Sequence, residues 1–285
     1  MRQPEPLIRN ISDTARWVAV YRAQESERPD ALFHDRFARE LAGERGHEIA
    51  SAVERRGYQP WPLAIRTFLF DQLILDCVRQ GVDVVVNLAA GLDMRPFRMD
   101  LPRELVWVEV DLPEILDYKE SVIRDQRSQC ALRRVRMDLG DRGARRHLLS
   151  ELGRQSKNAL VITEGLLIYL TPEQAAELAS DLAQAPGLKH WIVDIVSPGL
   201  RRMMTRRFGS FLEEANAPFQ FSPEEGPGFF GTHGWKPVAT RSIFKTAAAK
   251  KRVNWMMRLF ALWPDPKFPL NQHAIWGGVC LLERG

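Results

Sequence analysis

The sequence has few of the residues that mark disulfide-linked, metal-binding or membrane-spanning proteins. It contains 3 cysteines in 285 residues, far apart and in no CxxC pair, which argues against a disulfide framework or a cysteine zinc site. Its 6 histidines show no HExxH or related spacing, so we predict no bound metal. No apolar run approaches the roughly 20 residues that cross a bilayer, so we predict no membrane span.

Support for a signal peptide is also missing. The chain starts MRQPEPLIRNISD, with acidic and proline residues where a signal peptide needs an apolar stretch. Together with the scarce cysteines, this start predicts a cytoplasmic protein in a reducing compartment.

Lysine is scarce too, although the chain is basic. It has 40 Lys and Arg against 36 Asp and Glu, a net charge of +4, and only 8 of the 40 are lysines. Four net charges spread over this length give little support to a nucleic-acid partner. We interpret the 32 arginines mainly as surface pairing residues.

Seven short apolar runs predict the strands of one sheet. The first five are each followed by a turn and a helix-like segment, and they are apolar nearly throughout, as in strands buried on both faces of a parallel sheet. The third is Arg-rich and fits an edge. The runs cover residues 83–88, 105–110, 132–137, 159–163, 191–196, 238–244 and 275–282. This order predicts an α/β fold with a doubly wound, seven-stranded, mostly parallel sheet.

A helical preface precedes the predicted core, which covers residues 83–197. Residues 1–82 contain no convincing strand, and apolar residues recur at helical spacing in 13–25, 31–41 and 62–79.

Two further segments follow the core, and all four segments form one predicted domain. Residues 198–237 carry prolines and glycines among aromatic residues, which predicts an irregular lid over a substrate. Its phenylalanines fit ordinary core and an apolar pocket wall equally well; they are Phe208, Phe211, Phe219, Phe221, Phe229 and Phe230. Residues 238–285 hold the last two strands and a helical stretch, 247–263. We favour packing of that stretch against the lid over contact with a membrane or partner.

Acidic and small residues close the first four predicted strands. Ligands of open α/β sheets bind beyond the carboxyl ends of the strands, so these residues are the candidate site. They are Ala89, Gly91, Asp111, Asp138, Leu139 and Glu164. Asp111 is placed to accept hydrogen bonds from both ribose hydroxyls, and Asp138 with Leu139 could hold the edge and face of an adenine.

The turn after the first strand distinguishes between nucleotide cofactors. It reads AxGxD, whereas a dinucleotide fold would show GxGxxG to hold a pyrophosphate. Carboxylates at the neighbouring strand ends repel phosphates but suit a cation that carries ribose, adenine and an amine. S-adenosylmethionine has this charge pattern, so we predict it as the cofactor.

The strings VVNLAAGLDMRPFR, WVEVDLPEILDYK, MDL, TEGLLIYLTPEQ and HGW resemble the leucine carboxyl methyltransferase family of class I methyltransferases. The likeness runs over nearly the whole chain and is greatest to bacterial O-methyltransferases of polyketide biosynthesis. It implies that Arg66 pairs with the methionine carboxylate of S-adenosylmethionine and that Glu164 lies near its amino group. Without the resemblance, Arg66 would be expected to pair with an acid such as Asp71.

The resemblance also shows a departure in the cofactor loop. Many members have glycine where this chain has Ala89, which is tolerable if the backbone keeps φ below zero. The only candidate for a catalytic residue is Tyr169, which either points its hydroxyl at the acceptor or is a buried core tyrosine. For His233 we favour a turn role over catalysis, and for Asp93 and Arg95 a structural role.

These observations predict an S-adenosylmethionine-dependent O-methyltransferase that acts on a carboxylate or acidic hydroxyl of a small, largely apolar, polyketide-like metabolite. A carboxylate acceptor is already ionised at neutral pH, so positioning and desolvation would supply most of the rate. The alternatives are a protein or peptide C-terminal carboxyl methyltransferase, and an RNA-modifying or RNA-binding member of the fold. The last requires the arginine clusters to converge beside the cofactor site.

Overall fold

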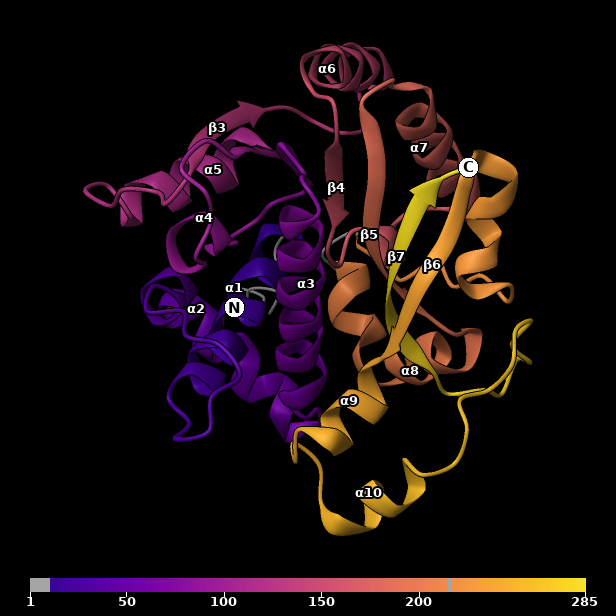
Figure 1. The fold of residues 1–285 in the computed structure, drawn as a ribbon. Helices are drawn as coiled ribbons and strands as arrows, with labels where there is room; N and C mark the ends of the chain where they lie inside the picture. Colours follow the sequence, from indigo (N-terminus) through magenta and orange to yellow (C-terminus); the bar gives the residue numbers. More distant parts are fainter. Residues whose placement is uncertain (1–10, 215–216) are drawn as a thin grey trace.

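A seven-stranded sheet forms the centre of the computed structural model, which describes residues 11–214 and 217–285 (Figure 1). The strands are β1 (Val84–Leu88), β2 (Val106–Asp111), β3 (Ala131–Arg136), β4 (Ala159–Thr163), β5 (Leu188–Val196), β6 (Trp235–Ser242) and β7 (Gly277–Arg284). All seven predicted strands are present, with ends shifted by up to three residues. Predictions about residues 1–10 and 215–216, and about the side chains of Phe208 and Phe211, lie outside the described part.

The strand order is β3-β2-β1-β4-β5-β7-β6, and β7 runs antiparallel to both of its neighbours. β3 lies at an edge, as its arginines predict. Strand order reverses between β1 and β4, which are parallel neighbours, so their carboxyl ends flank the crevice in which such sheets bind ligands. The predicted doubly wound, mostly parallel fold is confirmed.

Helices cover both faces of the sheet. α6 (Arg142–Gln155), α7 (Pro172–Gln184) and the 3-10 helix η2 (Gly226–His233) pack on one face, while α3 (Trp61–Arg79) and α9 (Ile243–Ala249) pack on the other. Alternation along β1 explains this division, because Val84 and Val86 face the first group and Val85 faces the second. Burial of each such side chain stabilises the fold by roughly 1.5–3 kcal/mol.

A third cluster lies beyond the carboxyl ends of the strands. It joins α1 (Ile11–Ser26) and α2 (Ala38–Arg55) to α4 (Arg95–Arg98) and α5 (Pro113–Val122) through buried apolar side chains. The cluster therefore places α1 over the loops that follow β1 and β2.

The helix predicted at 31–41 is wrong over its first seven residues, since α2 begins at Ala38. Side-chain hydrogen bonds hold the preceding segment as a loop. Asp35 accepts from Arg22 Nε at 2.9 Å and from the Phe37 N–H, while its own N–H donates to Ser26 Oγ. These bonds compete with helical ones, and the buried Phe33 and Phe37 make an apolar pattern without a helix.

The insertion at 198–237 is less irregular than predicted, because α8 (Pro198–Glu214) occupies its first 17 residues. Pro198 is the first residue of that helix, a position where the missing N–H costs nothing. The preceding Ser197 caps it by accepting from the Leu200 N–H at 3.2 Å. The proline and glycine thus start a helix here and do not break one.

The single helix predicted for 247–263 is also wrong. α9 ends at Ala249, Lys251 has φ +57°, and α10 (Trp255–Phe260) starts after Asn254, which caps it by accepting from the Met257 N–H. The favoured packing of this stretch is wrong as well, since Trp255, Leu259 and neighbouring apolar side chains are exposed.

Cysteines and potential metal ligands are dispersed over the described part of the chain. Cys77, Cys130 and Cys280 are buried free thiols, and no cluster of potential metal ligands occurs in the described ranges. None of the helices in the part of the chain that the structure covers is long and apolar enough to cross a membrane.

Candidate functional site

A cavity of about 1380 Å³ lies at the carboxyl ends of the central strands. All seven predicted cofactor residues line it, as does Tyr169; they are Arg66, Ala89, Gly91, Asp111, Asp138, Leu139 and Glu164. Pockets for one small ligand usually have about 300–1,000 Å³, so this one has room for two molecules side by side.

Asp111 ends β2 with its carboxylate fixed by two backbone donors. The Gly91 N–H donates to Oδ2 at 2.6 Å and the Leu112 N–H donates to Oδ1 at 2.7 Å. Burial raises its pKa, against the lowering effect of these two hydrogen bonds. Gly91 has φ +50°, and a Cβ there would lie 3.3 Å from the Cβ of Ala15, so any other residue at this position would be strained and crowded.

Ala89 does not keep the negative φ under which an alanine would be tolerated at this position. Its φ is +55°, in the left-handed region, where a Cβ lies too close to the following carbonyl oxygen. The loop is therefore strained at Ala89, at a cost of roughly 1–2 kcal/mol, although it keeps the course that places Gly91 against Asp111.

Arg66 reaches the cavity from α3, where it lies between two carboxylates. Its Nε donates to Glu164 Oε1 at 3.1 Å and its Nη1 donates to Asp194 Oδ2 at 3.3 Å. Gly165 makes room for the guanidinium, since a Cβ at this position (φ +70°) would lie 3.0 Å from Arg66 Nη1. Arg66 thus pairs with acids other than Asp71, the partner expected for it without the family resemblance. Arg66 and its two acids form a row of alternating charge along one wall.

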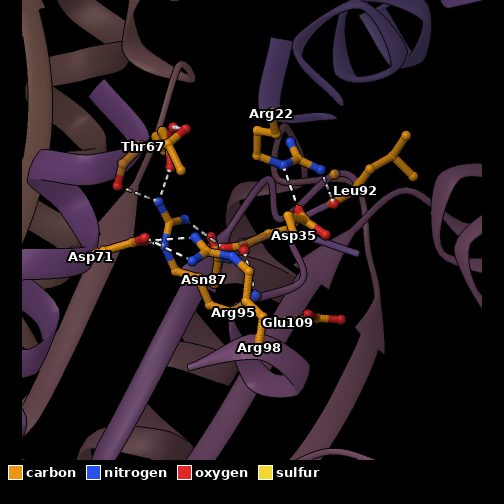
Figure 2. A network of polar contacts seen from close by, with 12 residues as sticks. Arg22, Asp35, Thr67, Asp71, Asn87, Leu92, Arg95, Arg98 and Glu109 are labelled. Atoms are coloured by element: carbon orange, nitrogen blue, oxygen red, sulfur yellow. Dashed lines mark hydrogen bonds and ion pairs between the residues drawn. The ribbon is translucent and has the colours of Figure 1, made fainter. Parts of the chain in front are cut away.

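A second set of ion pairs holds α4 on α3 behind that wall (Figure 2). Arg95 Nε contacts Asp71 at 2.6 Å, its Nη1 contacts Asp93 at 2.7 Å, and its Nη2 contacts Glu164 at 2.7 Å. Arg98 adds two bonds of 2.8 Å to Asp71. Asp93 also accepts from the Arg95 N–H, which agrees with the structural role predicted for both residues.

The protonation of these acids follows from their cationic neighbours. Burial alone would raise the pKa of Asp93, but the charges of Arg95, Lys119 and Arg98 lower it to about 2. Glu164 behaves similarly, because Arg95 and Arg66 outweigh burial and lower its pKa. For Asp194 burial outweighs Arg66, and the pKa is raised. Glu164 and Asp93 are thus ionised at neutral pH and fix the two arginines.

Asp138 and Leu139 lie on the rim of the cavity beyond β3. Asp138 is exposed, and its Oδ1 accepts from the Gly140 N–H at 2.8 Å. Leu139 is half-buried, and its carbonyl accepts from Arg145 Nη1 at 2.7 Å. Both are held by local bonds in positions open to a ligand in the cavity.

The opposite side of the cavity is mainly apolar. Its wall combines α1, α8 and the segment after it, with side chains that include Trp17, Leu200, Met203, Met204 and Phe219. The sequence left open whether the phenylalanines of the insertion form core or pocket wall. Phe219 lines the cavity, whereas Phe221 and Phe230 pack in the core beside Trp191 and Trp235.

Tyr169 and His233 lie in different surroundings. Tyr169, on the 3-10 helix η1 (Leu167–Tyr169), lines the cavity with its ring 5.6 Å from that of Phe219, and burial raises its pKa despite a hydrogen bond with Thr14. His233 lies outside the cavity lining, 3.2 Å from Ser180 Oγ and against Phe229.

The sequence interpretation missed Asp194. It lies within β5, and its Oδ1 accepts from the Gly165 N–H at 2.7 Å while Oδ2 pairs with Arg66. One signal was available, since a single acid in an otherwise apolar central strand needs a partner.

The arginine cluster on β3 does not face the cofactor site as a free basic surface. Arg133, Arg134 and Arg136 each pair with acids. Their partners are Glu109, Asp117, Glu120 and Glu151. This agrees with arginine used for surface pairing, and the β3 cluster gives no support to an RNA partner.

Known sequences match this chain over most of its length. A family model described as leucine carboxyl methyltransferase matches residues 15–183. A Streptomyces avermitilis protein with a proposed S-adenosyl-L-methionine-dependent methyltransferase activity is 34% identical over 253 residues, which cover 84% of this chain and 87% of that protein. A Parafrankia protein named for the same activity is 32% identical over 248 residues, 79% of this chain and 77% of its own.

Two crystal structures share the fold. One, of a proposed methyltransferase from Thermobifida fusca, has a TM-score of 0.60 at 15% identity and covers 98% of this chain and 96% of its own. The other, a DUF574 family protein from Streptomyces avermitilis, has a TM-score of 0.59 at 11% identity and covers 95% and 97%. At these identities the likeness concerns the fold alone.

Proposed function

Since the chain belongs to the leucine carboxyl methyltransferase family and is an S-adenosylmethionine-dependent methyltransferase, we propose that it methylates oxygen. The acceptor in this proposal is a carboxylate or acidic hydroxyl of a small, largely apolar molecule. The resemblance to the family is confirmed by the sequence matches, and the polyketide-like character of the acceptor stays a prediction.

The observation that carries the proposal is the row of alternating charge beside Asp111 in one cavity. Arg66 between Glu164 and Asp194 suits a zwitterionic amino-acid group, with the arginine facing its carboxylate and the acids its ammonium. The fixed carboxylate of Asp111 suits two ribose hydroxyls. Asp138 and Leu139, at the rim, suit an adenine.

Support for a small apolar acceptor comes from the other half of the cavity. Its wall of Trp17, Met203, Met204 and Phe219 offers apolar contact, and Arg207 on α8 adds a cation that suits an acidic group. The room for two molecules favours a bound acceptor over a protein terminus, which needs an open groove.

The chemistry needs little from the protein beyond binding and orientation. S-adenosylmethionine, when bound, supplies an electrophilic sulfonium methyl group. Arg66, Asp111 and Glu164 would fix its position, and the apolar wall would exclude water from the acceptor oxygen. An ionised carboxylate needs no general base, so a role for Tyr169 would be to orient the acceptor.

Calorimetry with S-adenosylmethionine tests the cofactor residues. Asp111→Ala removes the ribose acceptor, and we expect affinity to fall at least tenfold, or by about 1.5–3 kcal/mol, the usual worth of hydrogen bonds to a charged group. Asp117→Ala, on the exposed side of α5, is the matched control and should bind normally. Unchanged affinity in Asp111→Ala would contradict the ribose assignment.

A second assay distinguishes the acceptor classes. Purified protein, S-adenosylmethionine and a panel of apolar carboxylic acids and phenols should give methylated products. Methyl esters release methanol at alkaline pH and aryl methyl ethers do not, so this treatment separates carboxylate from hydroxyl acceptors. Methylation of peptide C-termini, with no turnover of small acids or phenols, would overturn the proposed substrate class.

A further inference from the structure

The positive charge of this protein is concentrated in one short segment, residues 245–267. The segment holds six basic residues and one acid, a net charge of +5, whereas the whole chain has +4. The remaining 262 residues therefore sum to −1. Four of the 8 lysines lie here, Lys245, Lys250, Lys251 and Lys267.

The same segment carries most of the exposed large apolar side chains. Six of the nine residues 255–263 are large apolar residues that are 52–79% exposed. They are Trp255, Met256, Leu259, Phe260, Leu262 and Trp263. In Figure 1, α10 lies at the lower edge of the molecule, beyond α9 and away from the sheet. Exposed apolar groups gathered in this way usually mark an interaction surface.

The cavity accounts for only part of this apolar surface. Met257, Phe260 and Trp263 line the cavity and so face the proposed acceptor. Trp255, Met256, Leu259 and Leu262 are outside its lining. We call these four residues, together with the exposed Lys250, Lys251, Arg258 and Lys267, the outer surface.

We propose that the outer surface docks on an anionic lipid membrane. Tryptophan, leucine and methionine enter the headgroup boundary, and lysine and arginine attract anionic headgroups, each contributing a several-fold gain in affinity. This inference does not depend on the identity of the methyl acceptor. It implies that the cavity, whose mouth is walled by the inner side of α10, lies next to the lipid.

Two other occupants fit the surface less well. A symmetric dimer through this surface would place its four cations against the same four of the second copy, because an isologous interface presents the same patch on both subunits. A protein groove takes one helical stripe, whereas apolar side chains here lie on both the cavity side and the outer side of α10. A lipid boundary accommodates such a broad apolar tip.

Vesicle sedimentation with the full chain tests the proposal. We expect binding to vesicles of equal parts phosphatidylcholine and phosphatidylglycerol, weak binding to phosphatidylcholine alone, and loss of binding with added salt. The charge variant Lys250→Glu/Lys251→Glu/Lys267→Glu should lower the partition coefficient roughly tenfold or more. The apolar variant Trp255→Ser/Leu259→Ser/Leu262→Ser should do the same.

The chain offers a matched control in its other exposed lysines. Lys157→Glu/Lys189→Glu/Lys236→Glu makes the same change of charge elsewhere and should leave binding within about twofold, since headgroup attraction acts only near the surface. Thermal unfolding and binding of S-adenosylmethionine, measured on every variant, check that the fold is intact. Equal loss in the control, or no loss in the two test variants, would overturn the proposal. Absence of vesicle binding would do so too and would leave an acidic protein or a second copy as the occupant.

Discussion

The methyl group of Ala89 strains the backbone conformation that its loop requires. The loop must turn at this residue so that the Gly91 N–H meets Asp111, and the turn requires φ +55°. Glycine adopts such a conformation freely and alanine does not.

Ala89→Gly is therefore expected to stabilise the protein. Relief of the left-handed strain outweighs the added entropy of the unfolded chain, and the free energy of unfolding should rise by about 1 kcal/mol. Urea denaturation measures it. Ala90→Gly, at the neighbouring buried position without positive φ, is the control and should be destabilised by roughly 0.5–1 kcal/mol. A loss of stability in Ala89→Gly would mean that the loop is not strained at this position.

Asp93 gives a stability effect that depends on pH. Its pKa is lowered from 3.8 to about 2 in the folded protein, so its contribution is complete above pH 4 and is lost as the pH falls towards 2. Asp93→Asn should cost about 2 kcal/mol at pH 7, and the difference from wild type should shrink between pH 4 and pH 2. Urea denaturation over this range measures it, with the exposed Asp100→Asn as control. A difference that does not vary with pH would contradict the charge network as its source.

At the scale of elements, the sequence predicts strands better than helices. A strand such as Val84–Leu88 is buried on both faces and is therefore apolar throughout, a signal that needs no knowledge of its neighbours. In the segment 31–41 a helix was wrongly predicted for the first seven residues, because Phe33 and Phe37 are buried by tertiary contacts and not on a helix face. The helix α8 was not predicted, because Pro198 was interpreted as part of an irregular segment although it is the first residue of that helix.

The candidate site shows the same division. Carboxylates at the strand ends were predictable, because their position in the fold follows from the strand order. Asp194 was not predictable, since it lies inside β5 and its role depends on the tertiary contact with Arg66 on α3. Two of the three partners of Arg95, Asp71 and Glu164, likewise come from distant parts of the chain, whereas Asp93 is a neighbour in sequence.

Arg252 joins the segment between α9 and α10 to the N-terminal helices. Its guanidinium bonds Glu25 at 2.7 Å with both side chains at most 4% exposed, and it also reaches Asp30. Arg252→Ala leaves the buried Glu25 carboxylate with only the longer contact of 3.9 Å to Arg28, and we expect a loss of about 3 kcal/mol. Denaturant unfolding measures it, with the exposed Arg258→Ala changing by less than about 0.5 kcal/mol.

A double variant separates the ion pair from simple loss of packing. The loss of stability in Arg252→Ala/Glu25→Gln should be smaller than the sum of the losses in the two single variants. The double variant removes both charges, whereas each single variant leaves one charge buried without its partner. Additive losses would show that the pair itself contributes little.

At the scale of the whole molecule, stability should be lowest where apolar contacts are fewest. β1 and β4 are buried throughout, whereas most of residues 254–269 is exposed. Amide hydrogen exchange should be slowest in those two strands and fastest, among the helices, in α10. Protection of α10 equal to that of β4 would show that its exposed position in the structure is not the one populated in solution.

The place of β7 in the sheet affects how the protein is made. β7 follows both β5 and β6 in the sequence, yet it lies between them and pairs with both. Until β7 has been translated, β5 presents an apolar edge with unpaired backbone groups, the kind of edge on which nascent chains aggregate. Chaperone protection during synthesis therefore matters most for β5, and a chain that terminates before Gly277 would leave that edge open permanently.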